Sequence, residues 1–305
     1  MNFGRGIVAA TLATIAAGGI DLASAQPPGG GSPRAAFPER AEEGPPPGAF
    51  DKRPDLPASL WNASSTVART TYRHEWIEIP LGDGTDLRTW VEYPDGDMPA
   101  PVVIVLQYEG GLDDWVRGIA DQLASEGFIG VAPDLFSGFG PNAGGTDSFR
   151  TQDEAMRVGR DALTPDEAIR RAVAAAAYAA VFPRANGKIA AMGFGSGGTH
   201  SFRFAADAPT VDAAVVFYGS APDEAVMSRI KAPVIGLYGA DDPRVSSAAV
   251  SRTAAAMGAL GKRFEHHTYK GATRDFAMIQ IEGLNTPAIE DAWMRAVAFL
   301  RGHLQ

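Results

Sequence analysis

Continuous apolar runs separated by helical segments constrain the fold of this chain more than any other feature of its sequence. KRFEHHTY, from Lys262, predicts one strand of a sheet. Five further runs are typical of strands buried on both faces of a sheet: PVVIVLQ from Pro101, GFIGVAP from Gly127, KIAAMGF from Lys188, DAAVVFY from Asp212 and PVIGLYG from Pro233. Helical segments are expected at residues 114–126, 165–182, 198–206, 222–230, 246–260 and 288–304. This alternation predicts an α/β fold with a mostly parallel sheet and helices on both of its faces.

An antiparallel hairpin is predicted ahead of the parallel strands. YRHEWIEI and DLRTWVEY alternate with period two, and the turn at residues 82–84 lies between them. A clear start signal precedes the second helix, with Thr164 as N-cap, Pro165 in the first position and Glu167 able to complete a capping box. Residues 135–151 are predicted to form a long glycine-rich loop, and loops of this kind often cover functional sites.

The first 25 residues have the three parts of a cleavable signal peptide. Arg5 forms a short basic region, residues 7–20 are apolar, and Ala23-Ser-Ala25 offers a cleavage site. The apolar stretch is too short for a comfortable membrane span, so no stable insertion is expected after cleavage. Residues 26–57 are rich in Pro, Gly and charge and predict a flexible linker. Residues 58–305 then form the domain of a bacterial protein that we expect to be periplasmic or secreted.

The composition excludes several classes of function. The 305 residues contain no cysteine, which excludes disulfides, thiolate nucleophiles and Cys-based metal sites. The formal net charge is −9 and no block of Lys and Arg stands out, so neither nucleic acid nor an anionic membrane surface is an expected partner. The five histidines show no H-E-x-x-H spacing, and no metal site is expected.

The stretch AMGFGSGGTH, residues 191–200, follows a predicted strand and opens a predicted helix. Gly193, Gly195 and Gly198 match the glycine pattern of a dinucleotide-binding turn. Such a turn also needs a place early in its domain and a carboxylate at the end of the next strand. Here the stretch follows at least four strands, and the next strand ends Phe-Tyr-Gly-Ser at residues 217–220. A nicotinamide cofactor is therefore disfavoured, and we expect no cofactor.

The same stretch also fits the sharp turn that carries the nucleophile of an α/β-hydrolase. In that fold the nucleophile follows the fifth strand, the acid follows the seventh and the histidine follows the eighth. This chain has AMGFGSGGTH after its fifth predicted strand, Asp241-Asp242 after PVIGLYG, and a loop after FEHHTYKGA. The three positions therefore occur in the expected order.

Longer segments of the chain resemble the dienelactone hydrolases. APVVIVLQYEGGLDDWVRGIADQLASEGFIGVAPDLFSG is similar to the third strand, first helix and fourth strand of that family, and NGKIAAMGFGSGGTH to its nucleophile turn. KAPVIGLYGADDPRV carries the family's G-x-x-D-x-x-V acid loop, and YKGATRDF its histidine loop. The resemblance covers roughly residues 75–304. It implies an α/β-hydrolase fold and hydrolysis of a lactone or small carboxylic ester through an acyl-enzyme intermediate.

The chain departs from the family at three of its four chemical positions. In the family's turn, G-[YF]-C-x-G-G, the nucleophile falls on Gly195 of this sequence. The family's histidine falls on Arg274. A glutamate that restrains the resting nucleophile falls on Tyr108, although Glu109 is adjacent. Of the four, the resemblance leaves only the acid, Asp242, in place.

Neighbouring residues offer weak substitutes for the missing groups. Ser196 lies one residue beyond the apex of the turn, where its side chain points toward the helix. We interpret it as an N-terminal helix residue that caps a free N–H, and keep it as a reserve nucleophile. His267, on the strand before the histidine loop, is the best reserve base. His200 is expected to pack or to face solvent.

Backbone donors of an oxyanion hole do not depend on side chains. In this chain they would be the N–H groups of Ser196 and Glu109, at a helix N-terminus that favours anions. Arg274 could add a permanent cation, paired with Asp242. Two interpretations stay open: a family hydrolase whose activity is weak or lost, with an ester or lactone as its small-molecule partner, and a non-catalytic periplasmic binding or accessory protein for a small anion. Tyr108 remains a further candidate for the pocket, and the oligomeric state is left open.

Overall fold

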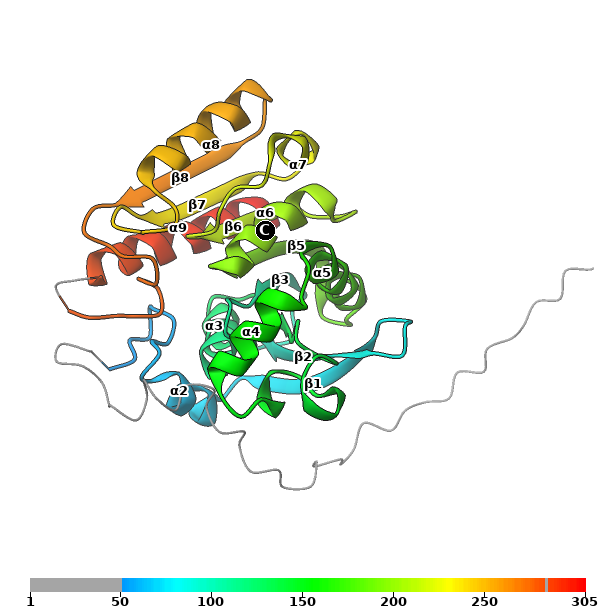
Figure 1. The fold of residues 1–305 in the computed structure, drawn as a ribbon. Helices are drawn as coiled ribbons and strands as arrows, with labels where there is room; N and C mark the ends of the chain where they lie inside the picture. Colours follow the sequence, from blue (N-terminus) through cyan, green and yellow to red (C-terminus); the bar gives the residue numbers. More distant parts are fainter. Residues whose placement is uncertain (1–50, 283–284) are drawn as a thin grey trace, which may run out of the picture. The chain divides into compact units, whose positions relative to one another are not determined.

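The computed structural model describes residues 51–282 and 285–305. Its centre is an eight-stranded sheet in the order β1-β2-β4-β3-β5-β6-β7-β8 (Figure 1). The strands are β1 (Arg73–Pro80), β2 (Asp86–Tyr93), β3 (Ala100–Leu106), β4 (Ile129–Pro133), β5 (Ala185–Phe194), β6 (Ala213–Phe217), β7 (Val234–Gly239) and β8 (Phe264–Tyr269). This is the predicted α/β-hydrolase architecture, with strands wherever the apolar runs indicated them.

The predicted hairpin opens the sheet. β1 and β2 pair antiparallel from Arg73 opposite Tyr93 to Pro80 opposite Asp86. Gly82 and Gly84 have positive φ angles of 79° and 89° in the turn between the strands, a conformation that glycine adopts without steric cost. β2 also pairs antiparallel with β4, and the remaining neighbours, from β4 to β8, are parallel.

Successive residues of the central strands point to opposite faces of the sheet, as the two-residue period of a strand requires. Val103 and Val105 of β3 pack in one cluster with side chains of α2, α3 and α9. Val102 and Ile104 pack in another with α5. A third cluster buries α6, α7 and α8 against β6 and β7. The sheet is therefore covered on both faces, as predicted.

Six of the helices correspond to predicted ones. Thr164 is the N-cap of α5, and its hydroxyl accepts a hydrogen bond from Glu167 N at 3.2 Å. The bounds of these six are α3 (Asp114–Ser125), α5 (Pro165–Ala179), α6 (Ser196–Asp207), α7 (Glu224–Arg229), α8 (Ser247–Ala259) and α9 (Thr286–Leu304).

Two further helices, α2 (Ala63–Arg69) and α4 (Gln152–Asp161), were not expected from the sequence. α4 follows directly on the predicted loop, whose own residues include two short 3-10 turns at Pro141–Ala143 and Thr146–Ser148. The sequence did contain a start signal for α4, because Thr151 and Glu154 have the spacing of a capping box, although the Glu154 side chain reaches one residue further back than the N-cap. Glu154 N donates to Thr151 Oγ1 at 3.2 Å, and Arg150 N donates to Glu154 Oε2 at 3.0 Å.

The predicted signal peptide, residues 1–25, lies outside the described residues, as does most of the predicted linker. The last residues of that linker pack on the domain. Leu56 is 1% exposed in the main core cluster, and Lys52 donates a hydrogen bond to Gln122 of α3 at 2.7 Å. Packed structure therefore begins a few residues before position 58. Within residues 51–282 and 285–305, none of the helices has the length and apolar character needed to cross a membrane.

Candidate active site

A sharp turn joins β5 to α6 at the centre of the sheet. Gly195 is the N-cap of α6 and has φ 59° and ψ −116°, a backbone conformation that residues with a side chain rarely adopt. A Cβ on Gly193 would lie 2.0 Å from Gly197 O, and one on Gly198 would lie 2.6 Å from Phe217 O. The protein's own backbone therefore accounts for these two glycines, with no phosphate group needed to explain them.

Three chain segments that are far apart in sequence meet at this turn. Arg274, after β8, lies with Nη1 3.5 Å from Oδ2 of Asp242, which follows β7. A Cβ on Gly195 would lie 3.2 Å from Arg274 Nη2. The positions predicted for nucleophile, acid and base are therefore adjacent in space.

The Glu109 carboxylate lies directly over the turn. Its Oε2 is 2.7 Å from the point that a Cβ of residue 195 would occupy. Its Oε1 lies 3.2 Å from Arg274 Nη2 and 3.2 Å from Arg244 Nη1. Glu109 thus carries the carboxylate that reaches the turn, whereas the Tyr108 side chain turns elsewhere. The family comparison by position had placed this glutamate on Tyr108 and noted Glu109 beside it.

Arg274 is held by two further groups besides Glu109. Its Nη1 donates a hydrogen bond to the carbonyl oxygen of Tyr218 at 3.0 Å. Tyr218 has a positive φ of 43°, which is uncommon for a residue with a side chain and is found mostly where the surrounding structure imposes it. The second group is Asp242, so the guanidinium lies among two carboxylates and one carbonyl. This arrangement holds the guanidinium in place beside the turn.

Asp242 is fixed from the other side by backbone donors. Its side chain is fully buried, and Oδ1 accepts hydrogen bonds from Arg244 N at 2.7 Å and Val245 N at 3.0 Å. Oδ2 has no hydrogen-bond partner among the described residues and faces Arg274. The carboxylate is therefore oriented toward position 274, as it would be to orient a histidine there.

A cavity of about 1020 Å³ opens over the turn. We call the residues that directly follow the strands, together with the first turn of α6, the floor of this cavity. We call α4 with Thr151 and Leu163 its roof. The cavity is lined by Gln107–Glu109 after β3, Leu135 and Phe136 after β4, Ser196 and His200 of α6, Arg244, Arg274, Asp275 and Met278, and parts of the segment from Thr151 to Leu163.

The roof and the floor are joined by a chain of hydrogen bonds. Gln152 Nε2 of α4 donates to the Tyr108 hydroxyl at 3.0 Å, and that hydroxyl donates to Asp113 Oδ2 at 2.7 Å. Asp113 also caps α3 by accepting from Val116 N. Burial raises the pKa of Asp113 to about 6, although both hydrogen bonds act in the opposite direction.

The sequence profile of the dienelactone hydrolase family matches residues 87–304. The chain belongs to the dienelactone hydrolase family. A protein of Saccharolobus solfataricus named "Putative carboxymethylenebutenolidase" is 29% identical over an alignment of 254 residues, and the match covers 72% of this chain and 95% of that protein. One of the same name from Escherichia coli K12 is 27% identical over an alignment of 219 residues, and the match covers 67% of this chain and 78% of that one.

Solved structures agree with this fold. A crystal structure titled "Putative Dienelactone Hydrolase", from Klebsiella pneumoniae, matches with a TM-score of 0.67 and 24% identity. The match covers 76% of this chain and 99% of that one. At this level of identity the likeness shows the fold. The chemistry of the turn depends on the residues that this chain has there.

The reserve groups at this dienelactone hydrolase turn differ in their access to the cavity. Ser196 is the first residue of α6 and lines the cavity. The structure has no side-chain cap at the start of this helix, so the capping role that we expected for Ser196 is not observed. His267 hydrogen-bonds to Glu265 at 2.9 Å on the edge strand β8 and is not part of the cavity wall. Of these two, Ser196 alone is placed to meet a bound molecule.

His200 was missed as a site residue. It lines the cavity one turn after Ser196, and its Nδ1 is buried with no hydrogen-bond partner among the described residues. Burial, assisted by the charge of Arg203, lowers the pKa of His200 to about 4, so the imidazole is neutral near pH 7. The spacing of four residues from Ser196 on one helix was the available signal, because such residues share a face.

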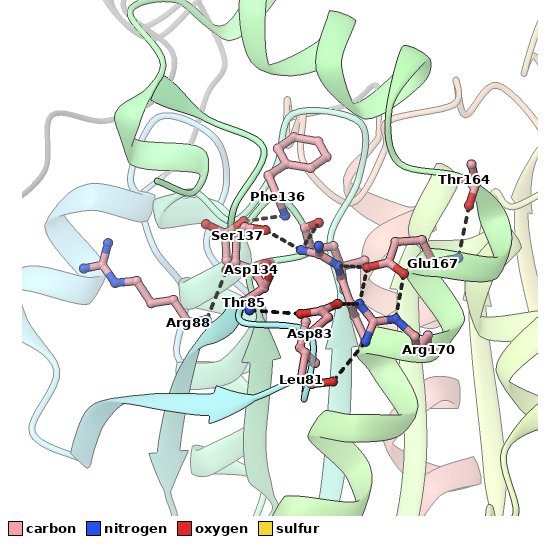
Figure 2. A network of polar contacts seen from close by, with 12 residues as sticks. Leu81, Asp83, Thr85, Arg88, Asp134, Phe136, Ser137, Thr164, Glu167 and Arg170 are labelled. Carbon is pink, nitrogen blue, oxygen red and sulfur yellow. Dashed lines mark hydrogen bonds and ion pairs between the residues drawn. The ribbon is translucent and has the colours of Figure 1, made fainter. Parts of the chain in front are cut away.

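The buried carboxylate of Asp134 anchors the part of the cavity wall that Leu135 and Phe136 form. Figure 2 shows Asp134 beside Phe136. Asp134 accepts hydrogen bonds from Phe136 N at 3.0 Å, and from the backbone N–H and hydroxyl of Thr146 at 2.7 Å each. Arg171 of α5 donates to Leu135 O at 3.2 Å, which ties the same loop to the helix layer. The glycine-rich segment that was predicted to cover a site is therefore fixed at its first residues.

Residues 51–282 and 285–305 contain no group of three or more His, Asp or Glu side chains placed to hold a metal ion. The charged groups of the cavity are instead cations and carboxylates in close pairs. Arg244 and Arg274 share Glu109, and Asp242 lies behind Arg274. In this dienelactone hydrolase family member the turn is therefore surrounded by paired charges.

Proposed function

We propose that this protein binds a small ester, lactone or carboxylate in the cavity over Gly195, and that the acyl-enzyme hydrolysis of its family is weak or lost. The observation that carries this proposal is the state of the turn. Its apex is a glycine, and the space of a nucleophile's side chain is taken by the Glu109 carboxylate and the Arg274 guanidinium.

The chemistry of the substituted groups supports the loss of acyl transfer. Nucleophilic catalysis needs a side chain that forms the covalent intermediate and a base that accepts its proton. Gly195 has no such atom, and an arginine side chain stays protonated in proteins, so Arg274 cannot replace an imidazole as the base. Asp242 then has no titrating ring to orient.

The donors that remain support the binding of a polar group. The N–H of Ser196 belongs to the first turn of α6 and has no partner within the helix. Arg274 and Arg244 line the same cavity as Ser196 and add two guanidinium groups, both of which bind Glu109 in the structure. A ligand carboxylate or ester oxygen would replace the Glu109 carboxylate at these donors.

Turnover by the purified protein tests the catalytic part of the proposal. We expect hydrolysis of p-nitrophenyl acetate and of a simple lactone to stay far below that of an ordinary dienelactone hydrolase assayed in parallel. Ser196→Ala should leave the residual rate unchanged. Turnover within roughly tenfold of the reference enzyme that disappears in Ser196→Ala would show that Ser196 has become the nucleophile, and would overturn the proposal.

Calorimetric titration with acetate tests the binding part. We expect wild-type protein to bind acetate in the millimolar range or tighter, and Arg274→Gln to bind it more weakly. Absence of binding in both proteins would remove the small-anion proposal. Export to the periplasm or the medium, which rests on the predicted signal peptide, is tested by fractionating bacteria that express the full chain.

A further inference from the structure

A second, smaller groove lies next to the main cavity, between α7 and α8. Its volume is about 320 Å³, near the lower end of the range of small-molecule pockets. Met227 of α7, Val245, and Val250 of α8 form its floor, and all three are buried. Ala249 and Ala256 of α8 form one wall. The floor and this wall of the groove are therefore apolar, while Ser220 and Thr253 add hydroxyl groups to its lining.

Arg244 separates the groove from the main cavity, because its side chain lines both. The side chain is 67% exposed, and its ion pair with Glu109 Oε1, at 3.2 Å, is the contact that draws it toward the cavity. Exposed ion pairs of this kind add little to stability, so Arg244 can turn away from Glu109 at small cost. Because Arg244 lines both spaces, we expect such a movement to open a passage between them.

We propose that the groove between α7 and α8 is a tail subsite, which takes the alkyl chain of a ligand whose carboxylate or ester group lies in the main cavity. The inference rests on the proposed function for the position of the polar group. It adds that the ligand is amphiphilic rather than a compact anion. Such a ligand would pass Arg244, whose guanidinium stays near the polar group while the chain lies on Val245, Val250 and Met227.

The difference in charge between the main cavity and the groove favours an alkyl chain in the groove. Glu109 and Arg274 lie in the main cavity, where an ionised group finds a partner. In the groove the buried floor is apolar, and Arg252 belongs to its exposed rim. Because an apolar chain gains free energy from the area it removes from water, each methylene group placed in the groove strengthens binding.

A series of straight-chain carboxylates, from acetate to octanoate, tests the proposal by calorimetric titration of the full-length protein. We expect the affinity to rise by roughly fourfold for each methylene group that enters the groove, and then to level off. Ala256→Phe fills the groove from its wall and should abolish the rise while leaving acetate binding unchanged. Ala255→Phe is the matched control, because Ala255 is exposed on the same helix and does not line the groove.

A second pair guards against a variant that fails to fold. Ala249→Phe fills the groove two turns earlier on α8, and Ala248→Phe places the same side chain on the exposed side. If octanoate binds no more tightly than acetate, or if the groove variants and their controls show the same dependence on chain length, the tail subsite is wrong although the head-group site stands. If no carboxylate of the series binds, both the subsite and the proposed function fail.

Discussion

Oε2 of Glu109 lies 2.7 Å from the point where residue 195 would carry its Cβ, closer than nonbonded atoms approach such a carbon. The two residues are thus matched: the carboxylate fits over the turn because position 195 has no side chain. A side chain there would need Glu109 to move, and with it the contacts that Glu109 makes to Arg274 and Arg244.

Gly195→Ala is expected to lower the free energy of unfolding by about 1–3 kcal/mol, because the positive φ is strained for alanine and the new methyl group meets Glu109. The cost should be smaller in a Glu109→Ala background. Gly261→Ala is the control, since Gly261 has φ 67° and open space around it. Urea unfolding measures these costs in the two Gly195→Ala proteins, in Gly261→Ala, and in the wild-type and Glu109→Ala references. Equal costs with and without Glu109 would show that the carboxylate is not held over the turn.

The double variant Gly195→Cys/Arg274→His is expected to hydrolyse p-nitrophenyl acetate faster than either single variant, because the thiol, the ring and Asp242 would then form a triad. General-base catalysis contributes on the order of 10²–10⁴-fold, and triad members act as a unit. The chain has no other cysteine, so thiol labelling is a clean second readout. Labelling should be faster in the double variant than in Gly195→Cys, which keeps the arginine. Equal labelling and equal hydrolysis would mean that these positions do not correspond to those of the family.

Glu109→Ala is expected to bind acetate at least about tenfold more tightly than the wild type, because Arg274 and Arg244 lose their shared carboxylate and take one from solution. The gain should shrink as salt is raised. Asp153→Asn is the matched control: it also removes a negative charge from the cavity lining but frees neither arginine. Calorimetric titration decides between them, and the same gain in both variants would reduce the effect to general electrostatics.

The raised pKa of Glu92 predicts that the protein loses stability as the pH rises through neutrality. Burial raises the pKa of Glu92 to about 8, with a further contribution from Asp121. The folded protein therefore holds a proton that the unfolded chain releases near pH 4.5, and stability should fall as the pH rises from about 4.5 to 8.

Glu92→Gln keeps a neutral hydrogen-bonding side chain beside Trp90 and should flatten this decline. Urea unfolding between about pH 5 and 9 checks it, with the exposed loop carboxylate Asp97 changed to Asn as control. A decline of unchanged slope in Glu92→Gln would assign it to other groups.

The sheet and the turn could be predicted because they leave strong local patterns. Apolar runs mark strands buried on both faces, and the spacing of the glycines marks a turn in which backbones approach closely. α4 could not be found in this way, since its residues are mostly polar or charged and Ala155 is its one buried residue. Thr151 and Glu154 have the spacing of a capping box, but such a pair alone is a short signal.

The details of the site depend on side-chain directions, which motif positions do not contain. Tyr108 and Glu109 are neighbours in sequence, yet one turns to Asp113 and the other to Gly195. The direction of each is set by the backbone after β3, and by partners that come from α3 and from the loops after β7 and β8. His200 was not expected to line the cavity for the same reason, because its position depends on how α6 packs against the other elements.

The hydrogen-bond chain from Gln152 to Asp113 joins two sides of the cavity that we expect to open at different rates. The turn directly follows the central strand β5, so we expect it to open only together with the sheet. α4 buries one side chain and is tied to the floor through Gln152, so it can detach at a fraction of that free energy. Amide protons of α4 should then exchange with solvent long before those of β5. For any molecule held in the cavity, the roof governs how quickly it enters and leaves, while the floor governs how tightly it stays.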